Sequence, residues 1–217
     1  MRAFIFANGE FCPQDAALTM QSDDLIIAAD GGSQHCIALD LRPDLLIGDL
    51  DSMDEKVLKE WRSDGVEIIS YSQDKDQTDL ELALLYAQDQ GVSEILVYGA
   101  AGGRLDMTIG NLTLLAHPDL TLPITLICGV EEVHLLRQGE SLTLNGTPGE
   151  IVSLIPLQPG LSTVTTEGLN YPLTNEALVF GYTRGISNRL VKEQARIKLE
   201  SGLLAVIHIR VNHLEKR

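Results

Sequence analysis

Two acidic clusters stand close together in the sequence, within the stretch 43–79. The first, Asp49 and Asp51, directly follows a short apolar run that is typical of a buried strand. Side chains two residues apart on a strand project to the same face, so both carboxylates could bind one cation. The second cluster places three carboxylates within residues 74–79, just before a helical pattern. Because magnesium binds carboxylate and phosphate oxygens, these clusters predict a magnesium-dependent enzyme that acts on a phosphate compound.

The second cluster also contains a lysine, Lys75, among the acids. Thr78 and Glu81 form a Thr-x-x-Glu capping box, and acids in a first helical turn complement the helix dipole. These effects account for Asp79 without any catalytic function, but they do not account for the lysine. A lysine that is held by carboxylates and directed at a phosphate is what a phosphoryl-transfer site requires.

Two glycine-containing segments supply further candidates. Asp30 ends an apolar run and precedes Gly31 and Gly32, which would allow a ligand to approach the backbone closely. Residues 99–104 are rich in glycine and precede a helix, where backbone N–H groups favour an anion, and Arg104 can bind phosphate bidentately. The spacing matches neither a Walker A loop nor a G-x-G-x-x-G motif, so a plain glycine-rich turn is an open alternative.

The elements that must position these residues follow from the apolar pattern. Continuous apolar runs of strand length alternate with helical patterns through residue 128, and the clearest helix is expected over residues 78–90. This alternation predicts an N-terminal three-layer α/β domain, Rossmann-like, with a mostly parallel sheet, over residues 1–129. Ligands of such sheets bind at the carboxyl ends of the strands, where Asp30 and Asp49 are expected.

The pattern changes after residue 129. Short strand-like runs separated by glycine, proline and asparagine predict an all-β domain over residues 130–217, a β-sandwich or barrel. One expected strand covers residues 190–199. Tyr171 stands beside proline in a loop of this half, where it could stack on a ligand, although a tyrosine packed in a turn is the simpler interpretation.

The composition limits the possible partners. The chain of 217 residues has a net charge of −15, which opposes binding to nucleic acid. No apolar run approaches the ~18 residues of a membrane span, and residues 3–7 are interpreted as a first strand and not as a secretory signal. We therefore expect a cytoplasmic protein that binds neither nucleic acid nor membrane. Its three cysteines are far apart and lack metal-ligand spacing.

Across nearly the whole chain, these motifs and their order resemble the thiamine pyrophosphokinase family. The most specific pair is Gly-Asp-x-Asp-Ser at 48–52 and Asp-Lys-Asp-x-Thr-Asp at 74–79. The other matching segments are residues 29–32, 99–111, 168–171 and 185–188. The resemblance implies an α/β catalytic domain that binds ATP and Mg²⁺, a β-sandwich that binds thiamine, and a homodimer with shared active sites. The implied reaction transfers the diphosphate of ATP to thiamine, giving thiamine diphosphate and AMP.

The resemblance also implies roles for individual residues. The expected magnesium ligands are Asp49, Asp51 and Asp79. The expected catalytic residues are Asp51, Asp79 and Lys75. The residues expected to face the nucleotide are Asp30, Gly31, Gly32, Thr78, Arg104 and Asp106. The residues expected to bind thiamine are Tyr171, Ser187 and Asn188.

Two other functions fit the same residues. The chain could be another magnesium-dependent phosphotransferase or phosphohydrolase that uses a different small acceptor. It could also be a non-catalytic sensor of a nucleotide or of thiamine, although a sensor has no need of so many clustered carboxylates.

Overall fold

The computed structural model describes residues 1–11, 20–50, 53–72 and 74–210. The chain divides into two compact units, Met1–Gly129 (unit 1) and Val130–Arg217 (unit 2). Unit 1 combines a parallel sheet with helices, whereas unit 2 is built from antiparallel strands. The prediction of an α/β half followed by an all-β half is confirmed at this level.

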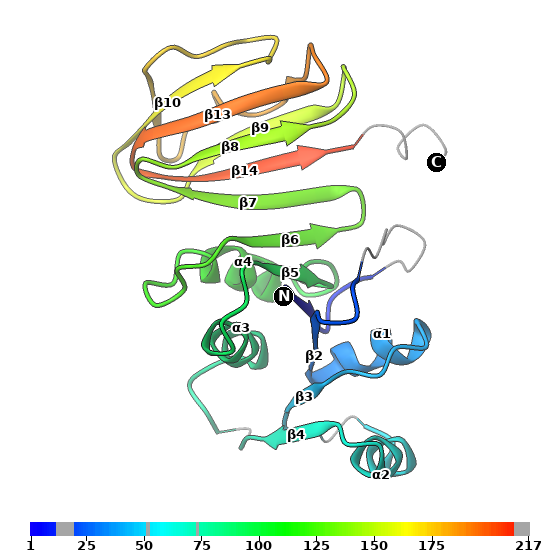
Figure 1. Cartoon of the computed structure of the whole chain (residues 1–217). Coiled ribbons are helices and arrows are strands. Elements are labelled where there is room, and N and C mark those ends of the chain that lie inside the picture. Colours follow the sequence, from blue (N-terminus) through cyan, green and yellow to red (C-terminus); the bar gives the residue numbers. More distant parts are fainter. Residues whose placement is uncertain (12–19, 51–52, 73, 211–217) are drawn as a thin grey trace. The chain divides into compact units, whose positions relative to one another are not determined.

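The strands of unit 1 all pair in parallel, in the order β6-β5-β1-β2-β3-β4 (Figure 1). They are β1 (Ala3–Phe6), β2 (Leu25–Ala29), β3 (Leu45–Gly48), β4 (Glu67–Ser70), β5 (Ile95–Tyr98) and β6 (Ile124–Cys128). Because β2 and β5 lie on opposite sides of β1, the strand order changes direction there. A crevice is expected at the carboxyl ends of the strands at such a switch point.

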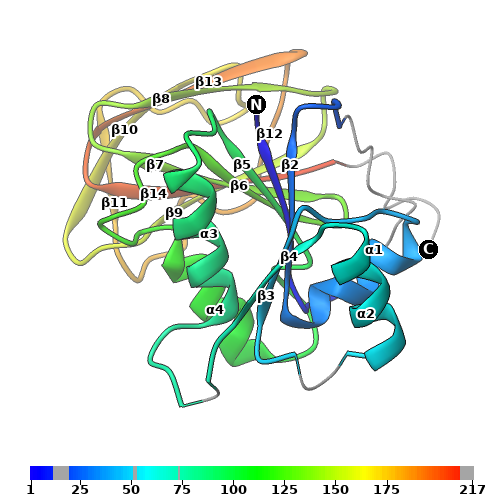
Figure 2. The same cartoon turned by 60° about the horizontal axis from the view of Figure 1, so that its bottom comes forward.

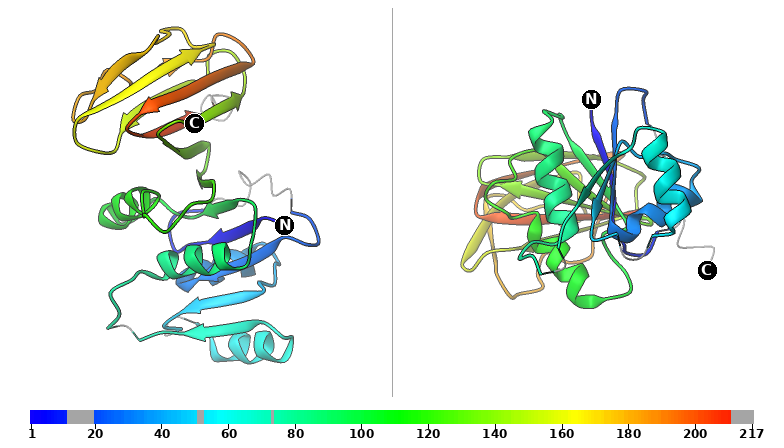
Figure 3. Two further views of the ribbon diagram at one scale, coloured as in Figure 1. Left: turned by 60° about the vertical axis from the view of Figure 1, so that its left-hand side comes forward. Right: turned by 90° about the horizontal axis from the view of Figure 1, so that it is seen from below.

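The helices of unit 1 cover both faces of this sheet. They are α1 (Ser33–Ala38), α2 (Glu55–Ser63), α3 (Asp79–Asp89) and α4 (Leu105–Leu114), and a short 3-10 turn, η1, covers Asp30–Gly32. Figure 2 and the right view of Figure 3 show α1 and α2 on one side of the strands, with α3 and α4 on the other. Phe4 and Phe6 of β1 pack in one cluster with Cys36 of α1 and Trp61 of α2. Alternate residues of the same strand point to the opposite face.

The strands of unit 2 form two antiparallel sets, β12-β9-β14-β7 and β11-β10-β13-β8. They are β7 (Glu131–Arg137), β8 (Ser141–Asn145), β9 (Ile151–Pro156), β10 (Leu161–Glu167), β11 (Glu176–Val179), β12 (Asn188–Arg189), β13 (Gln194–Ser201) and β14 (Leu203–Ile209). Both sets contribute to one hydrophobic cluster, for example through Val152 and Val206 from the first set and Val164 and Ile197 from the second.

One predicted strand of unit 2 has different bounds. Residues 190–199 do not form a single strand, because β12 ends at Arg189 and β13 begins at Gln194. Leu190 instead forms an isolated bridge with Leu169, and the carbonyl of Glu193 accepts a hydrogen bond from the backbone of Gly146. These long-range contacts turn the chain away from the strand direction.

No helix in the described part of the chain is long and apolar enough to cross a membrane.

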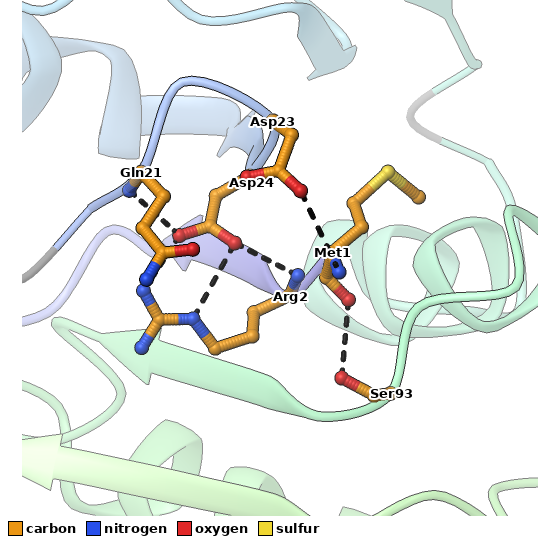
Figure 4. Close-up of polar contacts among 6 residues, drawn as sticks. All are labelled: Met1, Arg2, Gln21, Asp23, Asp24 and Ser93. Carbon is orange, nitrogen blue, oxygen red and sulfur yellow. Dashed lines mark hydrogen bonds and ion pairs between the residues drawn. The ribbon is translucent and has the colours of Figure 1, made fainter.

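A polar network joins the amino ends of β1 and β2 (Figure 4). The Asp24 carboxylate accepts hydrogen bonds from the Arg2 guanidinium at 2.6 Å and from the Arg2 backbone N–H at 2.9 Å. The backbone N–H of Gln21 also donates to Asp24, at 2.9 Å. The hydrogen bond from Arg2 is the main reason why the pKa of Asp24 lies well below its usual value. Asp24 is buried, so the network fixes the start of both strands.

We expect Asp24→Asn to lower the free energy of unfolding at pH 7 by about 1–3 kcal/mol, because buried donors lose a charged acceptor. The folded-state pKa of Asp24 is lower than the unfolded value of about 3.9. Its contribution is therefore complete above that value and is lost as the pH falls through the folded-state pKa. Urea unfolding should show the difference between wild type and variant at pH 7 and a smaller one at pH 3. The control Asp23→Asn, at an exposed neighbour, should change little at either pH; an equal effect would contradict the account.

Candidate functional site

A cavity of about 670 Å³ opens in unit 1 beyond the carboxyl ends of β1, β2, β3 and β5. We call it the switch-point cavity. Its lining comes from the segments after these strands and from the starts of α3 and α4: residues 7–10, 29–30, 49, 75, 77–80, 100, 102–104, 107 and 111. Segments that follow β1, β2 and β3 supply Asn8, Glu10, Asp30 and Asp49 to the lining, as the topology of a parallel sheet predicts.

Asp30 and Asp49 enter the cavity from neighbouring strands. A Cβ atom on Gly48 would lie 3.1 Å from the Cα of Asp30, so glycine lets the ends of β2 and β3 approach closely. Asp30 has a left-handed backbone with φ of 49°, which is uncommon for residues other than glycine. Its Oδ2 accepts a hydrogen bond from Nδ2 of Asn8 at 3.2 Å. The two predicted carboxylates thus line one cavity.

Helix α3 brings Asp79 to the cavity. The Thr78 Oγ1 caps the helix by accepting a hydrogen bond from the N–H of Glu81 at 3.2 Å, as the capping-box pattern predicts. The Lys75 Nζ lies 2.7 Å from the Asp79 Oδ1, and the two side chains are only 15% and 21% exposed. Lys75 also lies over the ring of Tyr71, 5.6 Å from its centroid. The lysine is therefore held in place by a carboxylate and an aromatic ring at the edge of the cavity.

The glycine-rich turn after β5 forms another wall. Gly102 and Gly103 have φ of 93° and 68°, a backbone conformation that other residues rarely adopt. Asn111 of α4 fixes the turn, because its buried Nδ2 donates to the carbonyl of Ala100 at 2.8 Å. The N–H of Gly103 donates to Oε1 of Glu10 at 3.1 Å. The turn predicted to bind an anion thus faces the cavity, and one of its N–H groups already holds a carboxylate of the protein.

Arg104 and Asp106 form an ion pair with each other. Nε and Nη2 of the arginine donate to the two carboxylate oxygens at 3.2 and 2.5 Å. The guanidinium holds the pKa of Asp106 below its usual value. Arg104 lines the cavity, whereas Asp106 does not. The structure therefore supports Asp106 as the partner of Arg104, and its own contact with a nucleotide stays a prediction.

Gly31 and Gly32 pack against the protein and do not line the cavity. A Cβ atom on Gly32 would lie 1.8 Å from the carbonyl oxygen of Phe6, and one on Gly31 would lie 2.1 Å from Oδ1 of Asn8. Close packing of η1 on the end of β1 is thus a sufficient reason for both glycines. Their expected contact with a nucleotide stays a prediction.

Asp51 lies outside the described residues, so its predicted roles as a catalytic residue and metal ligand remain predictions. Asn8, Glu10, Gln77 and Asn111 line the cavity but were not predicted to act there. Asn8 and Glu10 could have been predicted from the sequence, because they follow β1 in the same way that Asp30 follows β2. Asn111 lies inside helix α4, and its role becomes visible only in the structure, where its side chain bonds to the carbonyl of Ala100 in the glycine-rich turn.

The acidic lining fits a magnesium ion. The described carboxylates of the cavity outnumber its cationic side chains, the former being Glu10, Asp30, Asp49 and Asp79 and the latter Lys75 and Arg104. The Asp79 Oδ1 is buried, and in the described part of the chain it accepts no aligned hydrogen bond besides its ion pair with Lys75. No group of three acidic, histidine or cysteine side chains there could hold a metal by itself. Magnesium commonly takes one or two carboxylates and completes its shell with substrate phosphates, so Asp49 and Asp79 suit it.

Tyr171 and Asn188 of unit 2 are joined by two hydrogen bonds. The Asn188 Nδ2 donates to the carbonyl of Tyr171 at 2.8 Å, and its Oδ1 accepts from the N–H of Tyr171 at 3.0 Å. Asn188 is buried, whereas Tyr171 is 69% exposed. Ser187 is exposed and has φ of 64°. The three residues predicted to bind thiamine therefore share one region of unit 2, where Asn188 positions the loop that presents the Tyr171 ring.

Comparison with known proteins gives consistent matches over both units. A family model described as thiamin pyrophosphokinase, catalytic domain, matches residues 16–126, and one described as thiamin pyrophosphokinase, vitamin B1 binding domain, matches residues 136–204. The chain is 30% identical to a thiamine pyrophosphokinase of Bacillus subtilis, over 88% of this chain and 90% of the relative. It is 29% identical to thiamine pyrophosphokinase 1 of Arabidopsis thaliana, over 91% and 83%.

Solved structures show the same likeness. The crystal structure of a thiamine pyrophosphokinase from Bacillus subtilis superposes with a TM-score of 0.86 at 25% identity, covering 97% of this chain and 99% of the other. A thiamin pyrophosphokinase family protein from Enterococcus faecalis superposes with a TM-score of 0.82 at 26% identity, again over 97% and 99%.

Proposed function

Because the chain belongs to the thiamine pyrophosphokinase family, we propose that it transfers the diphosphate of ATP to the hydroxyl of thiamine. The products are thiamine diphosphate and AMP. The observation that carries this proposal from the structure is the switch-point cavity. It places the carboxylates of Asp49 and Asp79, the ammonium of Lys75 and a glycine-rich turn around one space, and these are the groups that transfer from a nucleotide requires.

The bond changes define what the cavity must do. The hydroxyl oxygen of thiamine attacks the β-phosphorus of ATP, and the bond from that phosphorus to the α,β-bridging oxygen breaks. AMP leaves with the bridging oxygen, and the hydroxyl proton passes to a base. Asp51 and Asp79 are the candidate bases. Lys75 and Arg104 neutralise the negative charge of the transferred group and of AMP, which lowers the barrier without covalent catalysis.

Magnesium is the proposed cofactor. Asp49 and Asp79, together with Asp51, would hold it, and the ion would supply neutralisation and polarisation of phosphate oxygens. The acidic lining of the cavity supports this. ATP brings further negative charge to a site with an excess of carboxylates, so a bound cation is needed to neutralise it. Asp30 and Thr78 line the same cavity and are proposed to contact the nucleotide.

Thiamine is proposed to bind through unit 2, with Tyr171 as the aromatic contact for its cationic thiazolium ring. A cation over an aromatic face is attracted by roughly 0.5–2 kcal/mol. We therefore expect Tyr171→Ala to raise the KM for thiamine by about 3- to 30-fold, with a smaller change in kcat and an unchanged melting temperature, because this side chain is 69% exposed. Steady-state kinetics with thiamine varied at saturating ATP would measure this. Tyr171→Phe, which keeps the ring, is the control; an equal loss in both variants would contradict stacking.

The proposal also covers finer features of fold and assembly. Unit 1 is proposed to be a three-layer, Rossmann-like domain, which the switch of strand order at β1 supports, and unit 2 a β-sandwich, which its shared hydrophobic cluster supports. The protein is proposed to act as a homodimer whose active sites combine the α/β unit of one subunit with the β unit of the other. The expected cytoplasmic location stays a prediction.

A nucleotide assay tests the proposed function. The protein is incubated with ATP and magnesium, with and without thiamine, and AMP, ADP and phosphate are quantified. Thiamine-dependent release of AMP is the expected result. Release of AMP or phosphate without thiamine would instead indicate a phosphohydrolase or a different acceptor. Binding of ATP or thiamine without any turnover would indicate a sensor and would overturn the proposal.

A further inference from the structure

Glu10 lies directly on the glycine-rich turn of the switch-point cavity. Its backbone N–H donates to the carbonyl of Ala101 at 2.7 Å, and its Oε1 accepts from the N–H of Gly103 at 3.1 Å. A Cβ atom on Gly102 would lie 2.5 Å from the Cβ and Cγ of Glu10 and 2.6 Å from its Cδ. The whole side chain therefore packs flat against this glycine, which only a residue without a side chain allows.

The donors expected to receive a phosphate are already engaged with protein oxygens. The N–H of Gly103 holds Glu10, the N–H of Gly102 donates to Oγ1 of Thr108 at 3.2 Å, and the Arg104 guanidinium holds Asp106. A carboxylate oxygen that accepts a backbone N–H at a turn before a helix takes the place that an anionic ligand would take there. Glu10 is exposed and lines the cavity, so its side chain is able to leave the turn.

We infer that Glu10 is a built-in anion that occupies the glycine-rich turn until the polyphosphate of the nucleotide displaces it. Glu10 then lowers the affinity for the nucleotide in two ways. The ligand must compete for the N–H of Gly103, and the Glu10 carboxylate, which lines the cavity, repels the negatively charged polyphosphate. This inference rests on the proposed function, because the competing anion is the polyphosphate of ATP.

The inference predicts a gain of affinity, which loss of an ordinary binding residue would not produce. With Glu10→Gln and Glu10→Ala, we expect the dissociation constant of α,β-methylene-ATP with magnesium to fall by about three- to tenfold at low salt. The analogue carries the full polyphosphate but has no cleavable bond between its α- and β-phosphorus atoms. Because the removed charge is solvent-exposed, the gain should shrink as salt screens it.

Calorimetric titration of the analogue without thiamine measures this at about 20 and 300 mM salt, the latter chosen to shorten the screening length. The matched control is Glu55→Gln, at an exposed glutamate of α2 outside the cavity. This variant should bind the analogue with a dissociation constant within about 1.5-fold of wild type, a free-energy difference of about 0.2 kcal/mol. Unchanged or weaker binding in both Glu10 variants would overturn the inference. It would also be overturned if neither wild type nor any variant bound the analogue. The proposed function fails separately, if no thiamine-dependent AMP appears, whatever the Glu10 variants do.

Discussion

Asp79→Asn is expected to reduce thiamine-dependent AMP release by about 100- to 1000-fold, equivalent to about 3–4 kcal/mol of transition-state stabilisation. The Asp79 Oδ1 is buried beside Lys75 at the edge of the cavity. Asparagine fills the same volume but lacks the charge that attracts a magnesium ion. It also leaves Lys75 without its ion-pair partner, so the ammonium loses the contact that holds it.

The same substitution should leave the fold nearly intact. Thr78 still caps α3, and Glu81 remains as an acid in the first turn. Loss of one charge near the helix N-terminus costs about 0.3–1 kcal/mol. Urea unfolding would measure this, while a magnesium titration of the rate should show a higher metal requirement.

Asp89→Asn is the matched control, because Asp89 is the last residue of the same helix and lies outside the cavity. Its rate should stay within about twofold of wild type, a difference of about 0.4 kcal/mol. A rate near that of wild type for Asp79→Asn at saturating magnesium would refute the role proposed for this carboxylate.

Lys75→Met is expected to lower kcat by about 100-fold and to raise the KM for ATP. Methionine keeps much of the length of the side chain but removes the charge that would neutralise the phosphates. Lys75→Arg should restore part of the rate, because arginine keeps the positive charge. The restoration should be incomplete, because a planar guanidinium differs in shape from the compact ammonium of lysine. Steady-state kinetics with ATP varied would measure both variants.

Lys59→Met serves as the control for Lys75, since Lys59 is exposed on α2 and pairs only at 3.6 Å with Glu55. A drop of less than about threefold in Lys75→Met, under about 0.7 kcal/mol, would show that this lysine only supports the structure of the turn. A full rescue by arginine would show that charge alone, and not its position, is needed.

The parallel half of the fold could be predicted from sequence because its signals are local. Each buried strand is a continuous apolar run, and Asp30 and Asp49 stand where such runs end. A parallel sheet gathers those ends at one edge, so the spatial closeness of the two carboxylates follows from the strand pattern. The start of α3 was likewise visible in the Thr78 and Glu81 pair, which forms the predicted cap.

What could not be predicted depends on contacts between distant segments. Gly32 is required because the carbonyl of Phe6 occupies the space above it, and nothing near Gly32 in the sequence indicates this. The start of β13 depends on the bridge between Leu190 and Leu169. The pairing of Asn188 with the backbone of Tyr171 joins residues 17 positions apart. Sequence motifs singled out Gly32, Tyr171 and Asn188, but they did not indicate which distant residue each of them contacts.

The proposed transfer of a diphosphate in one step is tested most directly by phosphorus NMR of a reaction with ATP, magnesium and thiamine. We expect thiamine diphosphate and AMP to accumulate in equal amounts, without ADP or thiamine monophosphate as intermediates. Formation of ADP together with thiamine monophosphate would mean that a single phosphoryl group is transferred from the γ-position. That result would contradict attack at the β-phosphorus and with it the arrangement of ATP proposed for the switch-point cavity.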